Sequence, residues 1–198
     1  MGKNEQKQFD DELFIRDEDW WHNACLDPFR ADWYVYIEGY KRAAMVLVDH
    51  VKMNRIDLDV LVYPIVFTYR QYIELQLKSI IRDGRKLLDQ AGEFPKHHRL
   101  RTLWEEARRI LEQVYEGDPT EELDEIEHYI NQFCGKDPFG SAFRYPTDRK
   151  GKKSLPGLMH INIRKFSEVF NKAAVLLDGA SMGIDEYLAW KIEMESEY

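Results

Sequence analysis

The chain has 198 residues, a net charge of −8 and two cysteines, Cys25 and Cys134. Its length suits one domain with a single core, and the cysteine spacing argues against a disulfide framework or a thiolate metal site. A phosphate-neutralising surface needs clustered Lys and Arg, so the acidic balance argues against wholesale binding to nucleic acid. The apolar runs are shorter than the roughly 20 residues of a membrane span, and the polar N-terminus is unlike a secretory signal. We therefore expect a cytoplasmic protein without membrane contact.

The N-terminal 30 residues differ from the rest of the chain. Residues 1–12 are polar and acidic, as in a disordered leader. The segment from Glu18 to Phe29 then carries Trp20, Trp21 and Phe29, which a solvent-exposed tail would not keep. We expect residues 1–30 to be a leader and docking arm, and residues 31–198 to be a helical domain.

Apolar residues at alternating spacings of four and three predict the first two long helices. The first covers residues 31–53 and has its stripe from Trp33 to Val51. The second covers residues 63–83, because Pro64 suits a first helical turn and Gly84 suits a C-terminal cap. A turn-rich connector, Gly84 to Pro95, follows it.

Two further helices are predicted after that connector. The stripe from Leu100 to Val114 predicts a third helix over residues 97–115. Asp118 as N-cap and Pro119 at the first helical position predict a fourth over residues 119–134.

The segment between Gly135 and Asn162 is too long for an ordinary connection inside a bundle. Phe143–Tyr145 and Leu158–Ile161 could pair as a small β-hairpin around a polar turn. A fifth helix is predicted over residues 162–177, closed by Gly179, and a sixth over Ile184–Met194. The predicted fold is therefore an all-α bundle of five to six helices, with an N-terminal arm and a small hairpin insertion. Its core should hold the following side chains: Tyr69, Ile73, Leu103, Trp104, Phe166 and Phe170.

No complete catalytic motif is present. The six histidines form neither HxxxH nor HExxH, and GxSxG, Walker and GxGxxG sequences are absent. We therefore expect no metal site and no cofactor.

A few polar residues stand where folding alone does not explain them. Arg70 and Glu74 are four residues apart, so they share one helix face. The ordinary interpretation is a surface ion pair that contributes about 0.3–0.5 kcal/mol. His98 opens the third helix at the end of a loop, where solvent and other elements can reach it. Arg144 and Tyr145 lie in the irregular segment, before its lysine-rich turn.

These residues also carry a family resemblance. The sequence YRQYIELQLK at residues 69–78, HRLRTLW at 98–104 and FRYP at 143–146 together resemble uncharacterised bacterial proteins similar to the HEPN superfamily of helical bundles. The resemblance implies a dimerising bundle. Many members are metal-independent ribonucleases of toxin–antitoxin and phage-defence systems, and others are non-catalytic modules that bind nucleotides or RNA.

The ribonuclease members carry an Arg followed four to six residues later by a His on a late helix. Here the predicted fifth helix has Arg164 without a following histidine, and His160 precedes it. Arg16 and His22 have the right spacing but lie in the arm, and about one such pair is expected by chance in a chain of this composition. We therefore expect a non-catalytic HEPN-like binding or accessory module for a nucleotide, RNA or an antitoxin-type partner protein, in a bacterial stress or defence system.

Two alternatives remain open from the sequence. In a ribonuclease with a non-standard site, His98 would be the acid/base, and Arg70 and Arg144 would hold phosphate. In the other alternative the protein is a structural homodimer without a ligand. The candidate binding residues are Arg70, Glu74, His98, Arg144 and Tyr145. For the first four we expect convergence on one cleft, with Glu74 and His98 in direct contact.

Overall fold

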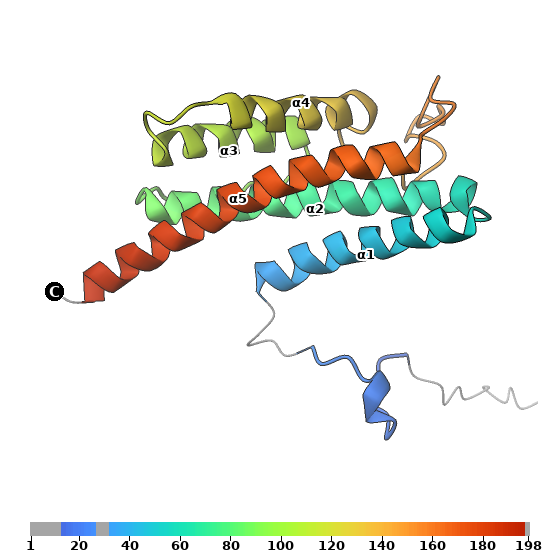
Figure 1. Ribbon diagram of the computed structural model, residues 1–198, viewed down its shortest axis with the longest axis horizontal. Helices are drawn as coiled ribbons and strands as arrows, with labels where there is room; N and C mark the ends of the chain where they lie inside the picture. Colours follow the sequence, from blue (N-terminus) through green and yellow to red (C-terminus); the bar gives the residue numbers. More distant parts are fainter. Residues whose placement is uncertain (1–12, 27–31, 197–198) are drawn as a thin grey trace, which may run out of the picture. The chain divides into compact units, whose positions relative to one another are not determined.

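The computed structural model describes residues 13–26 and 32–196, and helices make up more than half of them. The elements are η1 (Trp20–His22), α1 (Trp33–Asn54), α2 (Leu58–Leu87), α3 (Leu100–Val114), α4 (Glu121–Lys136) and α5 (Ile163–Ser196) (Figure 1). The described ranges contain no β-strand, so the predicted all-α helical bundle is confirmed. Within the same ranges, no helix combines the length and the apolar character that crossing a membrane requires.

The chain divides into two units after Asp32. In the first unit, the rings of Trp20 and Trp21 stack with their centroids 3.8 Å apart. Residues 1–12 and 27–31 of the expected leader and arm lie outside the described residues. Docking of the arm against the helical domain stays a prediction.

Helix α2 is the centre of the second unit. It packs against α1, α3 and α5, while α4 packs against α3 and α5 (Figure 1). Because neighbours cover α2 on several sides, most of its residues from Ile65 to Gly84 are buried. Polar side chains on this stretch are therefore held inside the protein rather than on its surface.

The predicted core residues lie between these helices. Tyr69 of α2 packs on Phe170 of α5 with ring centroids 4.0 Å apart, and Trp104 of α3 is only 2% exposed. Ile73 and Leu103 are fully buried, and Phe166 packs against the core while remaining half-buried. The helical stripes thus identified the faces that point inward.

Helix α2 begins five residues earlier than predicted and continues through Pro64. A proline inside a helix removes one backbone hydrogen bond, here the bond to the carbonyl of Val60. Val60 is exposed, so solvent can satisfy that carbonyl. The hydroxyl of Thr68 donates to the carbonyl of Pro64 at 2.5 Å. The assignment of Pro64 to the first turn was therefore wrong.

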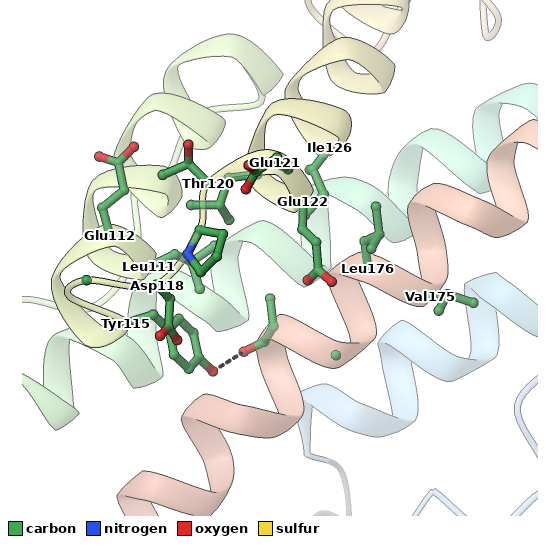
Figure 2. Close-up of a pocket in the computed structure, with 15 residues that line it drawn as sticks. Leu111, Glu112, Tyr115, Asp118, Thr120, Glu121, Glu122, Ile126, Val175 and Leu176 are labelled. Carbon is green, nitrogen blue, oxygen red and sulfur yellow. Dashed lines mark hydrogen bonds between the residues drawn. The ribbon is translucent and has the colours of Figure 1, made fainter.

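The predicted fifth and sixth helices are one continuous helix, α5, which passes through Gly179 and Gly183. A Cβ at Gly183 would clash with the hydroxyl of Tyr115 in the turn after α3. That hydroxyl donates to the carbonyl of Ala180 at 3.5 Å (Figure 2). Gly183 thus allows two elements to approach closely and does not end the helix.

Two other local predictions differ from the structure. Helix α4 begins at Glu121 with Thr120 as N-cap, not at Pro119 with Asp118 as N-cap. Residues 143–145 and 158–161 do not pair as strands; instead a single antiparallel bridge joins Thr147 to Lys153. The carboxylate of Asp148 accepts the backbone N–H groups of Lys150 and Lys152, which fixes a tight turn inside this bridge.

Candidate functional site

Three charged residues of α2 form a buried row at intervals of four. Arg70 and Glu74 are each 1% exposed, and Lys78 is 6% exposed. Glu74 Oε2 accepts a hydrogen bond from Arg70 Nη1 at 3.1 Å, and Oε1 accepts one from Lys78 Nζ at 2.9 Å. The interpretation of Arg70 and Glu74 as a surface ion pair is therefore wrong, because both charges have been removed from water.

His98 reaches this row from the connector before α3. Its Nδ1 lies 2.6 Å from Glu74 Oε1, while 67% of its side chain stays exposed. Arg70 Nη2 donates to the backbone carbonyl of His98 at 2.7 Å. A hydrogen bond to the ionised carboxylate requires a proton on Nδ1, so in the neutral imidazole Nε2 is the acceptor.

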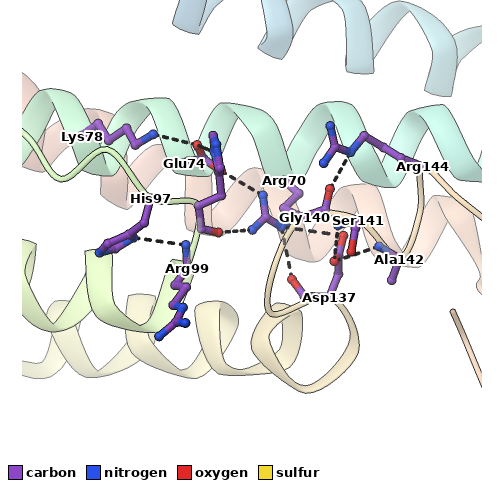
Figure 3. Close-up of polar contacts among 11 residues, drawn as sticks. Arg70, Glu74, Lys78, His97, Arg99, Asp137, Gly140, Ser141, Ala142 and Arg144 are labelled. Atoms are coloured by element: carbon purple, nitrogen blue, oxygen red, sulfur yellow. Dashed lines mark hydrogen bonds and ion pairs between the residues drawn. The ribbon is translucent and has the colours of Figure 1, made fainter. Parts of the chain in front are cut away.

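The third contact of Arg70 is with Asp137, at the end of α4. Arg70 Nε donates to the Asp137 carbonyl at 3.2 Å and lies 3.7 Å from its Oδ2 (Figure 3). Oδ1 of Asp137 accepts the backbone N–H groups of Ser141 and Ala142. Oδ2 has no hydrogen-bond partner within the described residues, so its charge is balanced by Arg70 alone. Asp137 therefore closes the turn that follows α4 and ties it to α2.

Gly140 allows this turn to lie against Arg70. Its φ is +73°, and a Cβ there would stand 2.5 Å from Arg70 Nη1. Arg144 Nε donates to the Gly140 carbonyl at 2.7 Å, and its guanidinium lies over the rings of Phe67 and Tyr145, 5.4 and 5.5 Å from their centroids. Arg144 and Tyr145 are both exposed.

The predicted convergence is met in part. Arg70, Glu74 and His98 contact one another directly, and the expected contact between Glu74 and His98 is present. Arg144 and Tyr145 form no hydrogen bond or ion pair with these three residues in the described part of the chain, and they connect to the network through the carbonyls of Gly140 and Ser141. Neither of the two pockets described below is lined by any of these five residues.

Sequence reasoning missed Lys78, Asp137 and Gly140. The spacing of four from Arg70 through Glu74 to Lys78 was a signal for Lys78, because it extends the same helix face. The sequence Asp-Pro-Phe-Gly at residues 137–140 is typical of a turn and could have indicated the other two. Nothing in it indicated that the turn would face Arg70.

The surroundings of Glu74 keep its carboxylate charged. Burial raises the pKa of Glu74, but hydrogen bonds from Lys78, His98 and Arg70 outweigh burial, and the pKa lies below its ordinary value. The hydrogen bonds to the Glu74 carboxylate link α2 to the connector before α3. Arg70 in turn links Glu74 to the turn after α4, through its hydrogen bond to Asp137.

A pocket of about 610 Å³ lies elsewhere, between α4, α5 and the segment that joins them. Its apolar walls include Phe133, Phe143, Phe166 and Phe170, of which Phe143 and Phe170 are buried. Its polar lining residues are Tyr129, Asn131, Gln132, Lys136, Asn162 and Lys165. Asn162 Oδ1 accepts the backbone N–H of Lys165 at 2.9 Å and so caps the first turn of α5.

No known protein family, curated protein or solved structure matches the chain. The resemblance to HEPN bundles therefore stands on residues 69–78, 98–104 and 143–146 alone. Those segments supply Arg70, Glu74, Lys78, His98, Arg144 and Tyr145 to the polar network. The pocket between α4 and α5 is lined mostly by residues outside them.

Proposed function

We propose that this chain is a non-catalytic, HEPN-like binding module whose ligand is an aromatic anion of the nucleotide class. The ligand binds in the pocket between α4 and α5. The observation that carries the proposal is the lining of that pocket, which combines aromatic rings, side-chain amides and two lysines. Its volume of about 610 Å³ is within the range of small-ligand sites, roughly 300–1,000 Å³.

The apolar part of the pocket suits a planar base. Phe133 and Phe166 line it and are half-buried, so each keeps ring surface available to a ligand. Stacking of a base on an aromatic side chain contributes about 1–3 kcal/mol and tolerates every base. The amides of Asn131 and Gln132 can both donate and accept, as hydrogen bonding to a base edge requires.

The two lysines supply the charge for a phosphate. Lys136 ends α4 and Lys165 lies in the first turn of α5. Neither side chain forms an ion pair within residues 13–26 and 32–196, although the protein is acidic overall. A helix N-terminus attracts anions, so Lys165 and the N-terminus of α5 would both attract the phosphate group.

The polar network on α2 argues for a non-catalytic assignment, because Arg70 cannot reach a phosphate. It is 1% exposed, and its donors go to Glu74, Asp137 and the carbonyl of His98. We propose that this network instead holds the connecting segments in place, including the segment that lines the pocket.

Calorimetric titration of the full chain with AMP, GMP, CMP and UMP, and with adenosine, tests the proposal. We expect saturable binding of the nucleotides, at least fivefold weakened by Phe166→Ala. Lys165→Met should weaken nucleotides but not adenosine, because it removes only the phosphate contact. Lys172→Met is the matched control, since Lys172 is an exposed lysine of α5 outside the pocket. Absence of saturable binding, or an equal effect of the control, would overturn the proposal.

One observation favours ribonuclease activity as a second candidate. A buried carboxylate orients the exposed His98 ring, which is the arrangement that positions a general base. In this case Glu74→Gln and His98→Ala should each abolish cleavage of a mixed RNA pool. His97→Ala is the control, because the His97 ring accepts a hydrogen bond from the backbone N–H of Arg99 and has no hydrogen bond to Glu74 among the described residues. An intact RNA pool with wild-type protein excludes this candidate.

The outer face of α1 favours self-association. Val35, Val46 and Met53 are exposed at helical spacing, and Arg42 and Asp49 lie on the same face. In an antiparallel pair of α1 helices, Arg42 of one copy would face Asp49 of the other, as an isologous interface requires. We propose a homodimer through this face. Light scattering should show a dimer for the wild type and a monomer for Val46→Glu.

A further inference from the structure

A second pocket, of about 850 Å³, lies between the turn joining α3 to α4 and the middle of α5 (Figure 2). Its deepest residues are Leu111 and Ile126, which are fully or almost fully buried. Leu123 and Leu176 are half-buried beside them, and Val175 is 69% exposed at the opening. Leu123, Leu176 and Val175 thus form an apolar surface that solvent reaches, above the buried side chains of Leu111 and Ile126.

Carboxylates surround this apolar surface. Glu112, Asp118, Glu121 and Glu122 line the pocket, and none of its lining residues is basic. Glu112 accepts a hydrogen bond from Arg108 Nε at 2.8 Å. Asp118, Glu121 and Glu122 form no side-chain ion pair or hydrogen bond anywhere in the described part of the chain. Three solvent-exposed carboxylates at the pocket are therefore available to pair with a cation.

The position of these acids identifies the kind of cation that fits. Figure 2 shows Glu122 pointing toward α5 near Leu176, and Asp118 on another side of the pocket, beside Tyr115. A metal ion needs carboxylates that converge on one point, and no cluster of three or more metal-binding side chains occurs in the ranges that the structure describes. Separated acids around an apolar floor instead match a molecule with separated positive charges and a hydrocarbon body.

Stabilisation of α4 explains only part of this arrangement. Acidic residues in the first turn of a helix interact favourably with its dipole, which explains Glu121 and Glu122. It does not explain Asp118, which precedes the helix. It also does not explain the apolar cavity next to the acids.

Gly179 of α5 leaves room for a larger side chain on one side of the pocket. It lines the pocket in the interior of α5, where glycine costs stability relative to alanine. A Cβ at this position would meet no atom within 4 Å, so packing inside the protein does not require glycine. A side chain placed at this position would therefore extend into the open space of the pocket and not into the protein.

We propose that this second pocket binds an aliphatic polyamine. The hydrocarbon segments lie on Leu123, Val175 and Leu176, and the ammonium groups pair with Asp118 and Glu122. The pocket's volume and its mainly apolar floor agree with the general features of small-molecule sites. The proposal is independent of the nucleotide pocket, because the two pockets share no lining residue.

The test is calorimetric titration of the full chain with spermidine at moderate salt. We expect saturable binding, weakened at least tenfold by the double variant Asp118→Asn/Glu122→Gln. Glu193→Gln is the matched control, since Glu193 is an exposed acid of α5 outside the pocket. The control should bind spermidine like the wild type.

Gly179→Leu separates loss of the site from loss of the fold. Leucine favours a helix over glycine, so this variant should have a higher Tm than the wild type. It should nevertheless lose spermidine binding, because the new side chain occupies the pocket. Absence of saturable binding to the wild type, an equal loss in Glu193→Gln, or unchanged binding in Gly179→Leu would each overturn the proposal. Equal affinity for Mg²⁺ would also overturn it, because the hydrocarbon surface would then play no part.

Discussion

Glu74 and His98 are joined by a contact of 2.6 Å between Oε1 and Nδ1, although one residue is buried in α2 and the other lies exposed on a connector. The contact exists because α2 ends at Leu87, beyond its predicted end, and the connector runs back along it. Phe94, in the same connector, lies over Lys78 and packs against Trp33 of α1. The polar network is therefore part of the packing that fixes the path of the connector.

Replacing Arg70 with methionine should destabilise the protein by about 3–5 kcal/mol, because it leaves two buried carboxylates short of a positive charge. Those carboxylates belong to Glu74 and Asp137. Urea denaturation of wild type and variant gives the difference in unfolding free energy. Arg164→Met is the matched control, since Arg164 forms an exposed pair with Glu168, and such pairs contribute about 0–1 kcal/mol. Similar losses in both variants would contradict the buried network.

The lowered pKa of Glu74 makes its contribution dependent on pH. Burial raises that pKa, and the hydrogen bonds from Lys78, His98 and Arg70 lower it by more, from an ordinary value of 4.5. The stabilisation by ionised Glu74 is therefore complete above about pH 4.5 and is lost as pH falls through the lower pKa of the folded state.

Unfolding free energies of wild type and Glu74→Gln, measured between about pH 7 and pH 3, test this dependence. The wild type should be the more stable protein near neutral pH, and the difference should shrink as the solution becomes acidic. The other carboxyl groups are present in both proteins, so the difference isolates Glu74. A difference that is constant over the whole range would mean that Glu74 is not held ionised by its neighbours.

Gly140→Ala tests the close approach of the turn after α4 to α2. Both Gly140 and Gly151 have a positive φ, +73° and +75°, so alanine is strained at either position. Only at Gly140 would the new Cβ also press on the guanidinium of Arg70; at Gly151 it meets no atom within 4 Å. Thermal denaturation should therefore show a larger loss for Gly140→Ala than for Gly151→Ala. Equal losses would show that backbone strain alone is responsible.

The sequence predicted features that depend on neighbouring residues better than features that depend on contacts between distant parts of the chain. Residues such as Trp104 and Ile73 lie on helical stripes, and the period of 3.6 residues was enough to place them in the core. The burial of Arg70 could not be read from its spacing to Glu74, because the same spacing occurs in exposed pairs such as Arg164 and Glu168.

The missing information in the site was long-range. Asp137 lies 67 residues from Arg70, and the connection depends on where α4 ends relative to α2. Local signals also misled where tertiary packing decided the outcome. Gly179 was predicted to close the fifth helix, yet α5 continues through it; Pro64 was predicted in a first helical turn, yet the exposed carbonyl at Val60 allows it inside α2.

Replacing either of two glycines of α5 with alanine should change the stability of the protein, but in opposite directions. At Gly179 a Cβ meets no atom within 4 Å, so Gly179→Ala should stabilise the protein by about 0.5–1 kcal/mol through helix propensity. At Gly183 the same change forces the Tyr115 hydroxyl away from α5, so Gly183→Ala should destabilise the protein despite the same gain in helix propensity.

Denaturant unfolding of both variants, and of Gly183→Ala combined with Tyr115→Phe, measures these effects. Removing the hydroxyl should recover part of the loss. If α5 were instead two helices with Gly179 as a left-handed cap, Gly179→Ala would be destabilising, so the sign at this one position distinguishes one continuous helix from two.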